Sequence, residues 1–338
     1  MTTASTFRDA RTVLITGASS GAGRATARAL AQRGARIVIV GHDLPRTRVA
    51  VDWLRRESGN PHVDLLLADL TCPQEVRDLV LAFRRGFGRL DVLINNAAVF
   101  SRDPRVGPGG FERTWALNHL ARVELSLGLL PLLRVRGAGR IVNVSSWLYR
   151  RGRIDFDDLA GVSRGRGWRS YAQSQLATVS FSRALARRLA GTGVTVNSSH
   201  AGLIDSAFGR AAATPIHLAW APEVAGMSGR HFVACRPTDP GGAAEDLELQ
   251  ERLWRFSLGQ LGLGDVGLDA GIRATDATEG LRGSGVGGSE ERLAVKKSQR
   301  SGPGVRVRPA LDIVCLHGRK RQAEAESVFS RGDAEGDR

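Results

Sequence analysis

The chain has 338 residues, which is enough for one large domain or two ordinary ones, and its 42% hydrophobic content is typical of a globular protein. It is strongly basic, with 48 Lys and Arg residues against 34 Asp and Glu residues and a formal net charge of +14. Because the arginines are scattered without aromatic residues between them, the charge indicates an arginine-rich composition and disfavours nucleic-acid binding.

Short β-branched runs alternate with amphipathic stretches over most of the chain. We expect strands at Val13–Ile15, Ile37–Val40, Val63–Ala68, Val92–Asn95, Ile141–Val144 and Val194–Asn197. We expect helices at Arg24–Arg33, Pro45–Glu57, Gln74–Arg85, Phe111–Leu133, Tyr171–Leu189 and Ala244–Leu261. This alternation predicts an α/β fold, namely a Rossmann-type doubly wound parallel sheet with helices on both faces.

The composition changes abruptly after residue 263. The segment 264–338 is rich in Gly, Ser, Arg and Glu and includes the run GLRGSGVGGSEERLAVKKSQRSGPG. Such a segment cannot bury enough apolar surface to offset the entropy lost on ordering. We therefore expect a single domain over residues 1–263, followed by a disordered tail over residues 264–338.

Cysteine, histidine and hydropathy patterns limit the cellular context. Cys72, Cys235 and Cys315 lie far apart without a CxxC pair, and the seven histidines lack metal-ligand spacing, so neither a disulfide framework nor a metal site is expected. No apolar run approaches about 18 residues, and the segment MTTASTFRDAR has no apolar core, so we expect no transmembrane helix and no signal peptide. These patterns favour a cytoplasmic location.

A glycine-rich turn, TGASSGAG over Thr16–Gly23, follows the first expected strand and opens the first expected helix. Its glycines allow the backbone to turn tightly and approach a pyrophosphate, and the helix N-terminus offers unpaired N–H groups. The alternative is a plain strand-to-helix turn, but three glycines in this register favour dinucleotide binding. The candidate nucleotide-binding residues of the turn are Gly17, Ser19, Ser20, Gly21, Ala22 and Gly23.

The TGxxxGxG spacing and five further motifs in the same order resemble the short-chain dehydrogenase/reductase family over residues 11–262. Those motifs are Asp69-Leu70, Asn95-Asn96-Ala97-Ala98, Asn118, and the pair RIVNVSS and YAQSQ, which carry Ser146 and Tyr171. The resemblance implies that Asp69 and Leu70 contact the adenine region of a nicotinamide dinucleotide and that Asn95 and Ala97 line its site. It also implies that Asn118 orders a proton-relay water.

The spacing of the last two motifs is similar to one branch of that family. Ser146 and Tyr171 are 25 positions apart, with the insertion GRIDFDDL over Gly152–Leu159 between them. This insertion and the run YAQSQLATVSFSRALARRLAGTGVTVNSSHAG resemble the retinol-dehydrogenase-like enzymes. The resemblance implies a small lipophilic substrate, such as a retinoid or another lipophilic alcohol, aldehyde or ketone.

The choice between NADP and NAD depends on the end of the second expected strand. An acidic residue there would accept the ribose hydroxyls and favour NAD, whereas a cation would favour the 2′-phosphate of NADP. Gly41 stands where that acid would be, His42 follows it, and Arg24 and Arg46 are nearby cations. We therefore expect NADP as the cofactor, with NAD as the alternative and His42 as a cofactor-binding candidate.

The family's catalytic residues are present except for a lysine. The resemblance makes Tyr171 the proton donor or acceptor and Ser146 the donor to the substrate oxygen. The family has a lysine one helical turn after the tyrosine, and Gln175 occupies that position here. An unperturbed tyrosine has a pKa of about 10, so roughly one molecule in a thousand is ionised at pH 7 without help from a positive charge. Residues 1–295 contain no lysine, so we expect strongly reduced activity.

Further departures leave two functions open. The family's Pro-Gly pair is replaced in His200–Gly202, and Phe208–Ala211 runs directly into TPIHLAWAPEVAG without the longer segment that covers substrate in related enzymes. One interpretation is an impaired oxidoreductase. The alternative is a pseudoenzyme that binds a nucleotide or a partner without turnover. A homodimer through the helices expected at Phe111–Leu133 and Tyr171–Leu189 is also left open.

Overall fold

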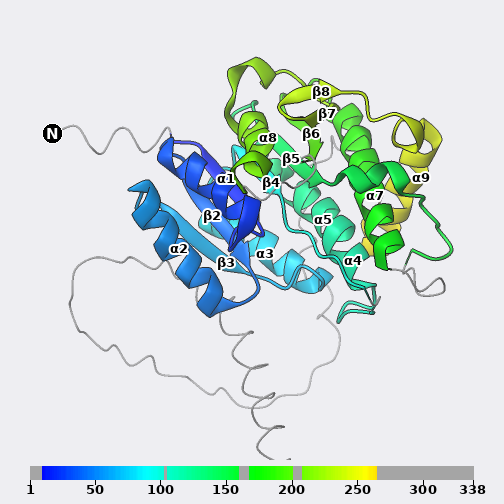
Figure 1. Cartoon of the computed structure of the whole chain (residues 1–338), viewed down its shortest axis with the longest axis horizontal. Helices are drawn as coiled ribbons and strands as arrows, with labels where there is room; N and C mark the ends of the chain where they lie inside the picture. The colour runs from blue at the N-terminus through cyan, green and yellow to red at the C-terminus, as the bar shows by residue number, and fades with distance from the viewer. Residues whose placement is uncertain (1–9, 103–104, 160–166, 201–207, 265–338) are drawn as a thin grey trace, which may run out of the picture.

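A computed structural model of the chain describes residues 10–102, 105–159, 167–200 and 208–264. The expected tail over residues 264–338 lies outside this part of the chain, apart from Gly264. Residues 201–207, which include most of the expected loop after the sixth strand, also lie outside it. The described residues form the expected doubly wound α/β fold (Figure 1).

The centre of the fold is an eight-stranded sheet with the order β3-β2-β1-β4-β5-β6-β7-β8. All neighbouring strands run parallel except β7 and β8, which are antiparallel. The strands are β1 (Thr12–Thr16), β2 (Arg36–Gly41), β3 (Val63–Leu67), β4 (Val92–Asn95), β5 (Arg140–Ser145), β6 (Thr195–His200), β7 (His231–Val233) and β8 (Arg236–Thr238). The first six match the expected strands to within three residues at each end.

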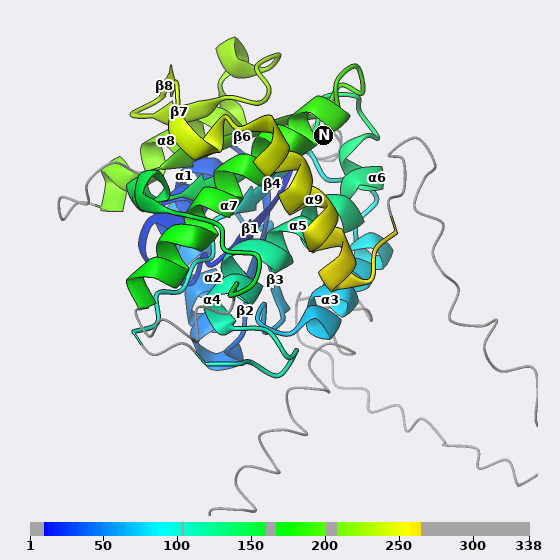
Figure 2. The ribbon, with the colours of Figure 1, turned by 90° about the vertical axis from the view of Figure 1, so that its right-hand side faces the viewer.

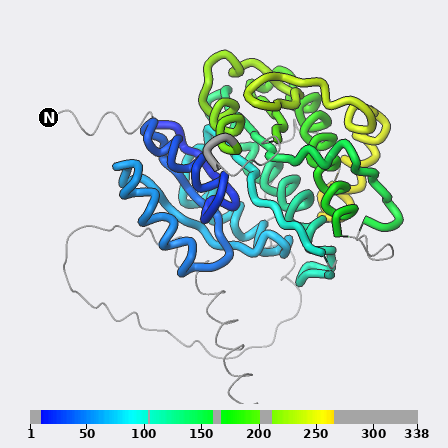
Figure 3. The backbone as a smooth tube through the Cα atoms, in the orientation of Figure 1, coloured from blue at the N-terminus to red at the C-terminus, as the bar shows by residue number. Residues whose placement is uncertain are grey.

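Helices cover both faces of this sheet. The longer ones are α1 (Gly21–Gln32), α2 (Leu44–Ser58), α3 (Pro73–Gly86), α5 (Ala121–Gly128), α7 (Gly167–Arg188), α8 (Phe208–Trp220) and α9 (Leu247–Leu261). The short ones are α4 (Arg113–Trp115), α6 (Leu130–Leu133) and the single turns η2 (Trp147–Arg151), η3 (Pro222–Val224) and η4 (Gly242–Ala244), with a π-helical turn η1 (Ala116–Leu120). The first half of the chain, blue to cyan, lies on one side of the molecule and the green and yellow second half on the other (Figure 3).

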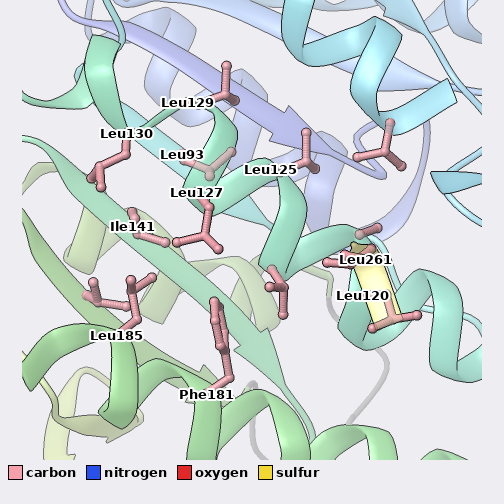
Figure 4. Close-up of a cluster of buried hydrophobic side chains, with 14 of the residues drawn as sticks. Leu93, Leu120, Leu125, Leu127, Leu129, Leu130, Ile141, Phe181, Leu185 and Leu261 are labelled. Carbon is pink, nitrogen blue, oxygen red and sulfur yellow. The ribbon is translucent and has the colours of Figure 1, made fainter. Parts of the chain in front are cut away.

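Alternation along the buried strands divides the core into two clusters. Val13 and Ile15 of β1 pack on one face of the sheet with α1, α2 and α8, whereas Leu14 packs on the other face. The second cluster is larger because α3, α5, α7 and α9 all contribute to it. Figure 4 shows Leu93 and Ile141 of the sheet facing Leu125 and Leu127 of α5, with Phe181 and Leu185 of α7 beside them. Burial on both faces explains why the middle residues of β1 and β2 and the first three residues of β4 are all apolar.

The sequence predicts one helix over Phe111–Leu133, and this prediction is wrong. The structure divides it into α4, η1, α5 and α6. The π-helical turn η1 inserts a wider turn at Asn118, and Pro131 near the start of α6 has no N–H to continue the hydrogen-bond ladder of α5. Apolar residues recur at helical spacing across both η1 and Pro131. The hydrophobic periodicity therefore does not indicate where the helix is interrupted.

Helix α9, the last one in the part of the chain that the structure describes, lies across α7 on the outside of the larger core (Figure 2). Trp254 stacks on Phe181 with ring centroids 5.7 Å apart, and His119 Nε2 lies 2.7 Å from Ser257 Oγ. Part of the surface of α7 is therefore covered by α9 of the same chain. A homodimer through α5 and α7 stays a prediction.

The hairpin β7–β8 was not expected from the sequence. Its strands have three residues each, and its turn places Ala234 and Cys235 at φ of 48° and 63°. Neither residue is one that favours positive φ, so no turn signal marked the hairpin.

No helix within the described residues is both long and apolar enough to cross a membrane.

Candidate active site

Strands β1 and β4 are neighbours in the middle of the sheet, and the order of the strands reverses between them. Their carboxyl ends therefore mark the switch point of the fold. Strands β2 and β3 follow on one side of β1, and strands β5 to β8 follow on the other side of β4. In doubly wound folds the crevice outside this switch point is where ligands bind. The hydroxyl of Thr16, the last residue of β1, accepts hydrogen bonds of 3.0 Å from the backbone N–H groups of Asn96 and Ala97. It therefore ties the two strand ends together.

Two glycines of the Thr16–Gly23 turn have no space for a side chain. Gly17 has φ of +68°, and a Cβ added to it would lie 2.7 Å from Ala97 Cα. A Cβ on Gly23 would lie 2.4 Å from both Asn96 Nδ2 and Gly17 O. The side-chain amide of Asn96 donates to Thr16 O at 3.0 Å and to Gly17 O at 3.2 Å. Asn96 therefore holds the turn closed, a role that sequence reasoning missed because it treated Asn95 and Ala97 as the candidates.

The start of α1 offers hydrogen-bond donors to an anion. Ser20 is the N-cap residue, its side chain makes no capping bond, and the first turn holds no acidic residue. Gly21 has φ of 58°, and Ser19 and Ala22 are half-buried beside it. The unpaired N–H groups and the positive helix end fit a pyrophosphate. The residues present in this turn therefore fit a dinucleotide.

The end of β2 has no room for an acidic side chain. A Cβ on Gly41 would lie 2.0 Å from Thr47 Oγ1. Asp43 does not substitute for it, because its carboxylate caps α2 by accepting from Arg46 N at 2.7 Å. Arg46 instead extends toward the glycine-rich turn, where its Nη2 donates to Ser20 Oγ at 3.2 Å. His42 is exposed at the same strand end. Arg46 therefore brings a guanidinium group to the glycine-rich turn at this end of the crevice.

The candidates after β3 and β4 have defined partners within the protein. Asp69 Oδ1 accepts from Thr71 N at 2.9 Å and from Thr71 Oγ1 at 2.7 Å, and Leu70 is buried. Asn95 is fully buried, and its Nδ2 donates to Asn143 Oδ1 at 2.8 Å. These contacts order the loop after β3 and join β4 to β5. Ala97 is half-buried and lies directly against Gly17.

Asn118 connects the loop after β4 to helix α7. It lies in the π-helical turn and is fully buried. Its Oδ1 accepts from Val99 N at 2.9 Å, while its Nδ2 donates to Val99 O and to Ser174 Oγ, both at 3.0 Å. Ser174 Oγ donates in turn to Tyr171 O at 2.8 Å. The side-chain amide thus binds the loop after β4 through Val99 and the first turns of α7 through Ser174.

Ser146 follows β5 and begins η2, whose Leu148 N donates to its hydroxyl at 3.4 Å. The segment that follows packs tightly on α7, since a Cβ on Gly152 would lie 2.4 Å from Ala172 O. Ser145 strengthens this contact by donating from Oγ to Gln175 O at 3.1 Å. The serine segment and the tyrosine helix therefore meet beside Tyr171.

Tyr171 lies in the first turns of α7 and is half-buried. Its ring packs edge-on against Phe100, with centroids 5.6 Å apart and planes at 76°. Gln175, one turn later, is buried, and its Nε2 lies 3.5 Å from Ser174 Oγ. The position at which the family has a lysine therefore carries a neutral amide in the protein interior.

A buried arginine was missed by the sequence reasoning. Arg122 of α5 donates to Val144 O at 2.7 Å, to Ala97 O at 2.9 Å and to Thr178 Oγ1 at 3.0 Å. Burial lowers the pKa of its guanidinium to about 10, and the charge of Tyr171 acts in the opposite direction. The group is therefore cationic at neutral pH. The available signal was an arginine one turn after Asn118, between the apolar residues Ala121 and Val123.

Burial lowers the pKa of the two histidines that lie beside Tyr149. His231 is buried against Tyr149, with ring centroids 4.9 Å apart, and burial followed by the charge of His200 lowers its pKa to about 3. Burial and the charge of Arg150 also lower the pKa of His200. Among the described residues, no group of three or more His, Cys, Asp or Glu side chains could hold a metal ion.

Comparison with known proteins identifies the family of the chain. The family model of short chain dehydrogenases matches residues 11–215. The chain is 37% identical over 291 residues to human retinol dehydrogenase 14 and 34% identical over 281 residues to human retinol dehydrogenase 13. Each match covers 75% of this chain and 87% or 85% of the relative, respectively.

Solved structures give the same result for the fold. An uncharacterized protein from Mycobacterium paratuberculosis superposes with a TM-score of 0.65 at 30% identity, covering 76% of this chain and 97% of that protein. The expected resemblance is therefore confirmed for the fold and for the family. The chain belongs to the short-chain dehydrogenase/reductase family of oxidoreductases, in which it is related to the retinol dehydrogenases.

Proposed function

We propose that the chain is an NADP-preferring oxidoreductase of small lipophilic alcohols, aldehydes or ketones, with Tyr171 as its acid–base residue. The observation that supports this most directly is the convergence of three segments at one edge of the sheet. These are the glycine-rich turn after β1, the Ser146 segment after β5, and the start of α7 with Tyr171, which Asn118 fixes through Ser174.

The glycine-rich turn would hold the pyrophosphate of the dinucleotide, for which the unpaired N–H groups of α1 are suited. Arg46, Ser20 and His42 would hold the 2′-phosphate of NADP. The contact of Arg46 with Ser20 and the absence of space for an acid at Gly41 support NADP over NAD. When bound, the nicotinamide supplies or accepts a hydride at the substrate carbon.

The chain's own residues would manage the proton and the substrate oxygen. In alcohol oxidation Tyr171 would accept the hydroxyl proton as the hydride leaves the carbon, and in carbonyl reduction it would return that proton. Ser146 would donate a hydrogen bond to the same oxygen. Phe100, whose ring contacts Tyr171, and the exposed Trp147 next to Ser146 support a lipophilic substrate at this position.

Gln175 supports a second candidate function. A neutral amide one turn after Tyr171 cannot stabilise a phenolate by charge. A pseudoenzyme that retains the glycine-rich turn would still bind the dinucleotide and could report its presence to a partner. The two functions share the nucleotide site and differ only in turnover.

Two successive measurements separate these functions. Calorimetric titration of the purified chain with NADPH and NADH is expected to give at least tenfold tighter binding of NADPH. Turnover is then measured with a panel of retinoids and aliphatic aldehydes and ketones. Turnover supports the oxidoreductase, whereas tight NADPH binding without turnover supports the pseudoenzyme. Failure to bind either dinucleotide would overturn both.

A further inference from the structure

Phe100 is an exposed aromatic residue in direct contact with Tyr171. The two rings pack edge-on, with centroids 5.6 Å apart and planes at 76°. The side chain nevertheless keeps 50% of its surface exposed. Burial of a phenylalanine side chain is favourable in itself, so the exposed half of this ring is apolar surface left open beside the phenol group. Ligand sites are lined mostly by apolar and aromatic surface of this kind.

The backbone on both sides of Phe100 is fixed. Val99 N donates to Asn118 Oδ1 at 2.9 Å, and Val99 O accepts from Asn118 Nδ2 at 3.0 Å. On the other side Ser101 lies against α7, since a Cβ on Gly167 would lie 1.8 Å from Ser101 O. The loop is therefore held by η1 before Phe100 and by α7 after it, which sets the position of the ring relative to Tyr171.

Two further exposed aromatic residues lie on the segments that meet near Tyr171. Trp168 is three residues before Tyr171, which places it on the same side of α7, and it is 40% exposed. Trp147 follows Ser146 and is 36% exposed. Aromatic rings gain from stacking on another flat π-system in addition to the area that they bury. A carbon that carries two methyl groups extends out of such a plane and loses this contact.

We propose that Phe100 determines substrate specificity by packing against the carbon next to the reacting carbon, so that a flat, trigonal carbon there is preferred over a branched, tetrahedral one. The proposal rests on the proposed function, in which Tyr171 exchanges a proton with the oxygen of a lipophilic substrate. That oxygen must lie within hydrogen-bond reach of the phenol group. The chain attached to it therefore passes close to the ring that contacts Tyr171.

A binding experiment tests this preference without turnover. All-trans-retinol is titrated into the chain with and without NADPH, and its binding is followed by energy transfer from tryptophan. Retinol and NADPH cannot exchange a hydride, because both are in the reduced form. Bound retinol is then displaced by trans-2-decenol, which is trigonal next to the reacting carbon, or by 2,2-dimethyldecanol, which is branched there. The ratio of the two displacement constants measures the preference.

The unmodified chain should bind the trigonal alcohol about tenfold more tightly than the branched one. Phe100→Ala should reduce this preference at least threefold, mainly through tighter binding of the branched alcohol in the space that the ring leaves. Phe100→Tyr, which keeps the ring, should retain the preference. Phe156→Ala is the matched control and should also retain it, because Phe156 packs edge-on against another ring, that of Phe256, with centroids 5.5 Å apart.

A folded Phe100→Ala chain with the preference of the unmodified chain would overturn the proposal. So would an unmodified chain that binds both alcohols equally or does not bind retinol, and so would an equal loss of preference in Phe156→Ala. Phe100→Leu gives the same comparison if the alanine variant does not fold, since leucine is apolar but not planar. A failure of the proposed function would appear instead as lost NADPH binding or turnover, while the preference stays measurable without NADPH.

Discussion

Asn118 and Ser174 are joined by a hydrogen bond of 3.0 Å between the amide Nδ2 of one and the hydroxyl of the other. The same amide also pairs with both backbone groups of Val99, and the serine hydroxyl donates to Tyr171 O. This relationship links the loop after β4, the π-helical turn and the tyrosine helix in one buried network. Asn118 acts here through direct protein contacts, in addition to any water it orders.

Asn118→Ala tests this network. The substitution leaves Val99 N, Val99 O and Ser174 Oγ without their partner, so the free energy of unfolding should fall by about 1–3 kcal/mol. NADPH turnover should fall at least tenfold, because Tyr171 loses its link to the sheet edge. Urea denaturation and steady-state kinetics measure the two effects. Asn60→Ala is the control, since Asn60 is also buried and donates to Ala31 O and Ala35 O far from the site. Equal losses of turnover in both variants would contradict the account.

Arg46→Glu tests the preference for NADP. It places a negative charge where Arg46 contacts Ser20, so the affinity for NADPH should fall at least tenfold while that for NADH changes little. Arg48→Glu, two residues later on the exposed surface of α2, is the matched control and should preserve the preference. Calorimetric titration with both dinucleotides measures the change. A parallel loss of NADPH and NADH affinity would show that Arg46 does not read the 2′-phosphate.

Glu124 predicts a pH dependence of stability. Burial raises the pKa of its carboxyl to about 7, against the opposing effect of Arg77, whose Nη1 lies 3.2 Å from Glu124 Oε1. Because the folded chain binds this proton more tightly than the unfolded chain, the resulting stability is fully present below about pH 4.5 and is lost as the pH rises through 7.

Glu124→Gln should therefore reduce the loss of unfolding free energy between pH 5 and pH 8 by about 2 kcal/mol. Urea denaturation at the two pH values gives this difference. The exposed Glu57→Gln is the control and should keep the pH dependence of the unmodified chain. An unchanged pH dependence in Glu124→Gln would show that another group is responsible.

Gln175→Lys tests whether the missing charge limits catalysis. An ammonium group one turn after Tyr171 favours the phenolate, so kcat at pH 7 should rise about tenfold, with the pH optimum moving lower. Gln175→Met, which is similar in length and neutral, should give no gain. Steady-state kinetics over a pH series with the same substrate panel gives both values. A lysine variant no more active than the unmodified chain would show that position 175 does not limit the rate.

The parts of the fold and site that the sequence predicted are those encoded by local patterns. Strands β1 to β6 contain the short β-branched runs that predicted them, and the glycine-rich turn is defined by residues within eight positions of each other. Asn96 and Arg122 escaped prediction because their roles depend on partners that are distant in the chain, such as Thr16 for Asn96 and Thr178 for Arg122. The π-helical turn and the β7–β8 hairpin depend equally on tertiary packing, which single-residue propensities do not contain.

The most direct test of the central claim is the turnover of NADPH by Tyr171→Phe. Tyr149→Phe is the matched control, because the hydroxyl of Tyr149 donates to Pro240 O and has no role in the proposed chemistry. Both variants are first shown by circular dichroism to be folded and by calorimetry to bind NADPH. The account predicts that Tyr171→Phe loses turnover by at least a hundredfold while Tyr149→Phe keeps most of it. Equal turnover in Tyr171→Phe and in the unmodified chain would contradict Tyr171 as the acid–base residue.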